Sequence, residues 1–229
     1  MKLITIIILI LFSTHAQSEC VVLLHGFART DSSMNKLESE LLKGNFTVIN
    51  VKYPSREHTI ERLAEEAITP ALGKCPLAER INFVTHSLGG ILVRQYTSNH
   101  VIARLHRVVM LGPPNKGSEV VDKLGNFPGF HFVNGDAGLQ LGTGELSVPN
   151  KLGNANFDVG IIAGTKSINW ILSTLIPNTD DGKVSVERTK LDGMNDHIEM
   201  PVTHPFMMKD DNVIAQVFYY LKHGRFRRE

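Results

Sequence analysis

The chain has 229 residues, of which 42% are hydrophobic and 21% are charged. This length is sufficient for one well-buried domain and rather short for two. Its 24 basic and 23 acidic residues leave a formal net charge of +1, so the charge balance does not indicate a nucleic acid or another polyanion as a partner. We therefore expect a single domain over residues 19–229 and no nucleic-acid partner.

The first 18 residues have the pattern of a secretory signal peptide. Met1-Lys2 is followed by an apolar run from Leu3 to Phe12 and then by small and polar residues. That run is about half of the roughly 20 residues that a membrane-spanning helix needs. We expect cleavage near Ala16 and a secreted or periplasmic protein, and an uncleaved N-terminal membrane anchor is the alternative.

After this segment, short apolar runs alternate with segments of helical period, which predicts a mostly parallel, doubly wound sheet with flanking helices. The expected strands cover 20–24, 46–51, 81–85, 107–111, 159–163 and 198–202. The expected helices run from Asp31-Ser32-Ser33 to Gly44, from about Ile60 to Pro70 or Gly73, and over 88–99, 169–175 and 211–221.

The two cysteines, Cys20 and Cys75, stand near the starts of the first and third expected strands. If these strands are parallel neighbours, both cysteines lie at the same end of the sheet. Export would allow a disulfide to persist, and we expect one to form. Two buried free thiols are the alternative.

Ser87 lies where the apolar strand that includes Ile81 breaks into the segment Thr85-His86-Ser87-Leu88-Gly89-Gly90 and then into a helix. This is the layout of a nucleophile elbow, in which a strained turn exposes a serine that needs a neighbouring base. Small residues are required two positions before and after the serine. Gly89 meets that requirement, whereas Thr85 replaces the usual glycine.

The first strand ends in His25-Gly26-Phe27, a loop suited to an oxyanion hole. Acyl transfer places negative charge on a carbonyl oxygen, and two fixed backbone N–H groups stabilise that charge. We expect the donors to be Phe27 and Leu88, the residue after the serine. For His25 we prefer a hydrogen bond that orders the loop over a role as base.

An acid and a base follow in the order that a serine hydrolase of the α/β type requires. Loops at the carboxyl ends of parallel strands gather at one edge of a sheet, so distant residues can meet there. We expect Asp181 to orient His204, and His204 to accept the Ser87 proton. Asp180 is the rival acid and His197 the rival base.

Together these segments resemble the α/β-hydrolase superfamily, in particular small bacterial lipases and esterases with a Thr-His-Ser-Leu-Gly-Gly elbow. The resemblance covers nearly all of 20–221 and rests on 24–27, 85–90, 111–114, 181–185 and 203–204. It implies the α/β-hydrolase fold in a reduced form without the two leading strands. It also implies ester hydrolysis through an acyl-serine, and no cofactor.

The segment 112–157 has recurrent glycines and prolines and no lasting period, so it is a cap over the site or a surface excursion. Its apolar residues would line an acyl pocket or fill the space under a loop: Phe127, Phe130, Phe132, Leu139 and Leu141. The aspartates show no calcium-loop spacing, and we expect no metal.

The leading hypothesis is an exported serine esterase or lipase that acts on a small-molecule or lipid ester, with transient contact to a lipid surface. An acyltransferase with the same three residues is an alternative. A noncatalytic binding protein that keeps the fold is another, because a fold alone does not establish chemistry.

Overall fold

The computed structural model describes residues 19–75, 77–125 and 130–228. Residues 1–18, the expected signal peptide, lie outside this description, as do the side chains of Phe127, Phe130 and Phe132. Within the described ranges, no helix is both long and apolar enough to cross a membrane.

A six-stranded sheet forms the centre of the molecule, and every neighbouring pair of strands is parallel. The order across the sheet is β2-β1-β3-β4-β5-β6, so the chain starts in the middle, builds outward to one edge and then returns to build the other. The strands are β1 (Glu19–Leu24), β2 (Thr47–Val51), β3 (Arg80–His86), β4 (Leu105–Leu111), β5 (Val159–Gly164) and β6 (Asp196–Met200).

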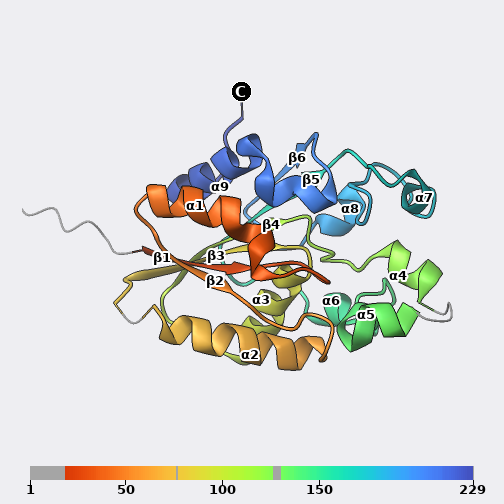
Figure 1. The fold of residues 1–229 in the computed structure, drawn as a ribbon, viewed down its shortest axis with the longest axis horizontal. Coiled ribbons are helices and arrows are strands. Elements are labelled where there is room, and N and C mark those ends of the chain that lie inside the picture. The colour runs from red at the N-terminus through yellow and green to blue at the C-terminus, as the bar shows by residue number, and fades with distance from the viewer. Residues whose placement is uncertain (1–18, 76, 126–129, 229) are drawn as a thin grey trace, which may run out of the picture.

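Helices cover both faces of the sheet (Figure 1). On one face lie α1 (Asn35–Lys43) and α9 (Asp211–His223), and on the other α2 (Ile60–Gly73) and α3 (Leu88–Asn99). Successive side chains of a strand point to opposite faces, so Val21 and Leu23 pack towards α1 and α9, whereas Val22 and Leu24 pack towards α2 and α3. The expected doubly wound sheet is therefore confirmed.

Several expected boundaries differ from the observed ones. The last strand starts two residues earlier than expected, at Asp196, and ends at Met200 before Val202. The second helix continues through Pro70 to Gly73, because a proline late in a helix removes only one backbone hydrogen bond. In α1, Leu37 and Leu41 are buried, whereas Leu42 is 52% exposed.

Residues 112–157 contain more regular structure than expected. Three short helices occur there: α4 (Glu119–Leu124), α5 (Phe130–Leu139), which is interrupted at Gly135, and α6 (Val148–Lys151). Two further short helices, α7 (Trp170–Ser173) and α8 (Val186–Thr189), follow β5. Figure 1 places α4, α5 and α7 beyond the end of the sheet at which the strands finish.

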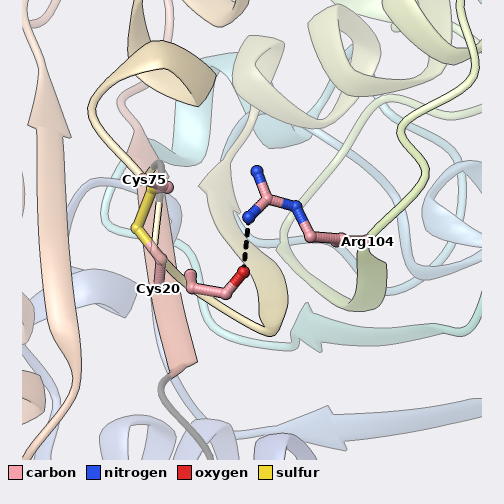
Figure 2. Close-up of a disulfide and its surroundings, with 4 residues drawn as sticks. Cys20, Cys75 and Arg104 are labelled. Carbon is pink, nitrogen blue, oxygen red and sulfur yellow. Dashed lines mark hydrogen bonds between the residues drawn. A yellow bond between two sulfur atoms is a disulfide. The ribbon is translucent and has the colours of Figure 1, made fainter.

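A disulfide joins Cys20 of β1 to Cys75, which lies between α2 and β3 (Figure 2). The strands β1 and β3 are parallel neighbours, with Cys20 paired with Ile81, so the expected geometry and the bridge are both observed. The Arg104 guanidinium beside the bridge donates a hydrogen bond to the carbonyl oxygen of Ala78 at 2.6 Å. The bridge lies at the end of the sheet where the strands begin.

Candidate active site

Ser87 occupies a strained turn between β3 and α3. Its φ of 51° and ψ of −118° lie in a region that side chains other than glycine rarely adopt. Its N–H donates to the carbonyl of Leu111 at 2.9 Å, and its carbonyl accepts from the N–H of Gly90 at 3.0 Å. The turn is therefore held by β4 on one side and by the first turn of α3 on the other.

The small residues around Ser87 allow α3 to lie against the sheet. A Cβ atom on Gly89 would come within 2.6 Å of the Leu24 carbonyl oxygen, so glycine is needed there. Thr85 is fully buried, and its hydroxyl is one of the described buried groups that lack a hydrogen-bond partner. The threonine thus fits the elbow, at the expense of an unsatisfied hydroxyl.

His204 and Asp181 lie in contact at the same edge of the sheet. The Nδ1–H of His204 donates to Asp181 Oδ2 at 2.7 Å, and both side chains are almost fully buried. The other carboxylate oxygen, Oδ1, accepts the N–H groups of Lys183 at 3.0 Å and Val184 at 2.9 Å. These bonds fix the carboxylate and place the proton of a neutral His204 on Nδ1, which leaves the lone pair on Nε2.

The rival residues take other positions. Asp180 Oδ1 accepts from the Ser173 hydroxyl and the Gly182 N–H, both at 2.7 Å, and so caps the turn. His197 lies in β6 and shares a hydrogen bond of 3.0 Å with the Thr189 hydroxyl. Asp181 and His204 line the same cavity as Ser87. Asp180 lines a different hollow, and His197 lines none of the described ones.

The chain turns back directly after Asp181 and does not form a strand there. Asp180 and Ser185 form an isolated bridge, and α8 starts immediately afterwards. Gly182 has a φ of 98°, so the chain turns back within a few residues. A tight turn held by its own aspartates therefore presents Asp181, rather than the start of a strand.

The loop after β1 lies beside Ser87. Phe27 lines the cavity, and Leu88 begins α3, whose first turn leaves backbone N–H groups without partners inside the helix. The two N–H groups that follow Phe27 are bonded within the protein. The Ala28 N–H donates to Ser55 Oγ at 3.1 Å, and the Arg29 N–H donates to the Gly26 carbonyl at 3.3 Å. The backbone is thus ordered around the expected oxyanion donors.

His25 is buried and orders this loop. Its Nδ1–H donates to the Gly26 carbonyl at 2.9 Å, and its ring stacks on Tyr53 with centroids 4.0 Å apart. The Tyr53 hydroxyl in turn donates to the His25 carbonyl at 2.5 Å. Burial lowers the pKa of His25, which keeps the ring neutral. These contacts match the expected loop-ordering role.

His86 has a position that sequence reasoning missed. A histidine before the serine is expected to pack against the strand behind it, but His86 lines the cavity and its Nε2–H donates to the His204 carbonyl at 2.9 Å. Burial and then the nearby His204 charge lower its pKa well below the ordinary value. A Cβ atom on Gly26 would lie 2.5 Å from His86 Nδ1. His86 therefore contacts both the loop after β1 and the His204 loop.

A cavity of about 220 Å³ opens beside Ser87. Its walls are mainly apolar, and they come from 112–157 on one side and from the segment around α7 on the other: Pro114, Val121, Leu141, Ile168 and Leu172. Leu139, expected with Leu141, is instead 41% exposed and does not line the cavity. The segment 112–157 thus contributes a wall of the site.

Arg94 holds this wall in place from α3. Its buried guanidinium donates to the carbonyl oxygens of Asn115 at 2.9 Å, Pro149 at 2.9 Å and Gly153 at 2.8 Å. Burial lowers its pKa to about 10, so the group stays charged at neutral pH. One side chain therefore ties both ends of the segment to α3.

The arrangement has the parts that nucleophilic catalysis requires: a strained serine, a buried histidine oriented by a carboxylate, and ordered backbone N–H groups nearby. In the described part of the chain, no cluster of three or more histidine, cysteine or acidic side chains has the geometry to hold a metal ion.

Comparison with known proteins places this geometry on a recognised fold. None of the protein-family models and none of the curated proteins matches the sequence. Solved structures do match: the mature lipase BlEst2 of Bacillus licheniformis has a TM-score of 0.68 and 18% identity, over 90% of this chain and 92% of that one. An esterase of Pyrococcus furiosus has a TM-score of 0.62 and 15% identity, over 90% and 82%.

A third match is the esterase RhEst1 of Rhodococcus sp. ECU1013, with a TM-score of 0.56 and 16% identity, over 90% of this chain and 91% of that one. These likenesses extend over nearly the whole chain and agree with the parallel six-stranded sheet and its helices on both faces. The chain therefore has the α/β-hydrolase fold.

Proposed function

We propose that the protein is a serine hydrolase that cleaves carboxylic esters through an acyl-serine intermediate. Ser87 Oγ attacks the ester carbonyl while His204 Nε2 takes its proton, and Asp181 stabilises the resulting imidazolium. The N–H groups of Phe27 and Leu88 stabilise the oxyanion. His204 then returns the proton to the leaving alcohol, and water repeats the sequence to release the acid.

One observation carries this proposal. The 2.7 Å bond between His204 and the fully buried Asp181 lies in the wall of the same cavity as the strained Ser87. Burying the Asp181 carboxylate has a desolvation cost, and a positive φ at a serine has a strain cost. Two such costs at one cavity indicate a functional site more strongly than a structural one. Lipases and esterases among the matched structures add support.

We also propose that the protein is exported. The Cys20–Cys75 disulfide is typical of oxidising compartments, and the first 18 residues have the composition of a cleaved signal peptide. Mass measurement of the native protein tests this. A chain that starts after about Ala16 is expected, and a chain that keeps Met1 and its apolar run would contradict cleavage.

We further propose transient contact with a lipid surface beside the cavity. Three large apolar side chains around α7 project into solvent, with exposures of 64% for Ile168, 74% for Trp170 and 58% for Ile171. Ile168 also lines the cavity, so a lipid surface bound there would lie at its opening. Exposed apolar clusters of this kind are typical of lipid or protein contacts.

The test of the catalytic proposal is Ser87→Ala, assayed with 4-nitrophenyl butyrate and with a fluorophosphonate label. Both hydrolysis and labelling should be lost, whereas Ser98→Ala, on the exposed side of the same helix, should keep both. Unchanged hydrolysis by Ser87→Ala would exclude the mechanism. Failure of the folded wild-type protein to label would favour a noncatalytic binding protein. Product analysis with added alcohol separates hydrolysis from acyl transfer.

A further inference from the structure

Two cations at the mouth of the cavity have no partner. Arg29 and Lys183 both line the cavity that contains Ser87, and both side chains reach solvent. Within the described residues, neither the guanidinium of Arg29 nor the ammonium of Lys183 forms an ion pair or a side-chain hydrogen bond. The cavity thus has two positive charges without ion-pair partners among the described residues, beside mainly apolar walls.

The backbone holds both residues at the site. The Arg29 N–H bonds to the Gly26 carbonyl, so Arg29 closes the turn that carries Phe27. The Lys183 N–H donates to Asp181 Oδ1 at 3.0 Å, and its carbonyl accepts from the Ser118 hydroxyl at 3.0 Å. The two cations therefore stand on the loops of the oxyanion donor and of the acid.

The two charges also act on each other. The pKa of Lys183 lies below its ordinary value because the protein partly desolvates the ammonium and because Arg29 repels its proton, with Asp181 acting in the opposite direction. Both cations contribute to the lowered pKa of His86 as well. Arg29 and Lys183 thus act electrostatically on each other across the cavity that both of them line.

The surrounding carboxylates do not neutralise this pair. In the described part of the cavity wall the one acidic side chain is Asp181, whose oxygens are already bonded to His204 and to two backbone N–H groups. Arg188 nearby, in contrast, is paired with Glu119 at 2.9 Å. The fold therefore compensates a neighbouring cation and leaves Arg29 and Lys183 free.

The positive charge continues into an adjoining hollow that shares Arg29. This hollow, of about 550 Å³, is also lined by Lys52 and Arg56, with Glu57 as the one carboxylate among its described lining residues. Neither cation forms an ion pair within the described residues. A ligand that extends from Ser87 past Arg29 would thus leave an apolar cavity and enter a basic one.

We propose that the substrate is an amphiphilic ester with an anionic group, a phosphate or a similar anion on the alcohol side. Its acyl chain lies along Val121, Leu141 and Leu172, and its anion lies between Arg29 and Lys183. This inference rests on the proposed ester hydrolysis and adds the substrate class to it. Charge-assisted bonds from two cations to one anion give both affinity and orientation.

The catalytic test compares two esters with the same acyl chain, 1-octanoylglycerol and 1-octanoylglycerol 3-phosphate. We expect kcat/KM to favour the phosphate ester by on the order of tenfold at low salt, and this ratio to fall towards one in Arg29→Gln/Lys183→Gln. Lys123→Gln removes an exposed charge of α4 that does not line the cavity, and should keep the ratio. Equal rates on the two esters, or a ratio unchanged by the double substitution, would overturn the inference.

A binding test separates this inference from the esterase proposal. In the Ser87→Ala background, titration calorimetry compares octyl phosphate, octyl glucoside and inorganic phosphate. Octyl phosphate should bind about tenfold more tightly than either of the others, and the added Arg29→Gln/Lys183→Gln pair should remove its advantage. Equal binding of octyl phosphate and octyl glucoside would refute the anion site. Equal binding of octyl phosphate and inorganic phosphate would refute an amphiphilic ligand.

The two tests fail in distinguishable ways. If the wild-type protein cleaves neither ester, ester hydrolysis is wrong, while the calorimetry still decides on the anion site. If it cleaves both esters equally, hydrolysis stands and the anionic substrate class is wrong.

Discussion

Two hydrogen bonds join His204 to Asp181. The imidazole donates to the carboxylate at 2.7 Å, and the backbone N–H of His204 donates to the Asp181 carbonyl at 2.9 Å. The second bond fixes the two loops to each other independently of the side chains. Replacing the carboxylate by an amide should therefore change the chemistry without moving the histidine backbone.

Asp181→Asn is expected to lower kcat by a factor on the order of 10³ to 10⁴, because the amide no longer stabilises the imidazolium and favours the wrong tautomer. Asp180→Asn is the matched control, since Asp180 caps the turn through Ser173 and Gly182. Its kcat should change by less than about tenfold. Steady-state kinetics on 4-nitrophenyl butyrate decide between them, and a larger loss for Asp180→Asn would reverse the assignment.

Arg94→Met should loosen the segment 112–157 as well as destabilise the protein. It leaves three carbonyl oxygens without their donor inside the protein, at a cost of about 3 kcal/mol or more. Urea unfolding measures the loss, and kcat/KM should fall because the segment forms a wall of the cavity. Arg62→Met removes an exposed i,i+4 ion pair with Glu66, which solvent screens, and should leave the urea midpoint nearly unchanged. Equal losses in the two variants would contradict the clamp.

Trp170→Ser/Ile171→Ser should reduce activity on lipid surfaces more than activity in solution. Burying one large apolar side chain in an interface contributes about 1.5–3 kcal/mol, so binding to vesicles should fall at least about tenfold. The measurement is the rate on a tributyrin emulsion divided by the rate on dissolved 4-nitrophenyl butyrate. Val101→Ser is the control, since Val101 is 94% exposed but follows α3, away from the cavity. Parallel loss of both rates would argue against a lipid-binding role.

Cys20→Ser/Cys75→Ser should lower the free energy of unfolding by about 4 kcal/mol, because the bridge closes a long loop in the unfolded chain. Reductant should reduce the stability of the wild-type protein by a similar amount and leave the double variant unchanged. The bridge is at the end of the sheet opposite the cavity, so the activity of the folded variant should persist at low temperature. Two alkylatable thiols in the native protein would contradict the bridge.

Stability should fall in mild acid. The folded-state pKa values of His25 and His86 are lowered, so below the ordinary value near 6.5 the unfolded chain binds protons that the folded chain does not. Each such histidine adds up to about 1.4 kcal/mol per pH unit to the slope. Urea midpoints from pH 8 to pH 5 should show this fall. His86→Gln should flatten the slope, whereas His223→Gln, on the exposed end of α9, should not.

The fold was predictable because its elements are strongly patterned. Buried parallel strands appear as short apolar runs, and helices such as α2 and α9 show a clear apolar face. The prediction placed β6 two residues too late in the sequence, because an edge strand is half-buried and its hydrophobic pattern is weak. The short helices α4 to α6 were not predicted, because short segments show no clear period. Contacts distant in sequence help to hold them, such as the bond from Arg94 to Pro149 of α6.

Only part of the candidate site could be predicted from the sequence. Ser87 has a local signature, whereas the choice between Asp181 and Asp180 depends on a turn that neighbouring residues set jointly. The contact of His86 with His204 spans two loops and has no local signal, although a bulky polar residue before the serine is a reason to examine that position. The absence of ion-pair partners for Arg29 and Lys183 among the described residues also depends on the tertiary structure, so the sequence does not indicate it.

The close approach of Gly26 to His86 has a consequence for how the site can vary. A methyl group at position 26 would press on the imidazole of His86, whose other nitrogen bonds the backbone of His204. We therefore expect a substitution at Gly26 to disturb the backbone of His204 through His86. The loops after β1 and β6 thus meet at His86 at the end of β3, and we expect changes in these loops to be tolerated together rather than singly.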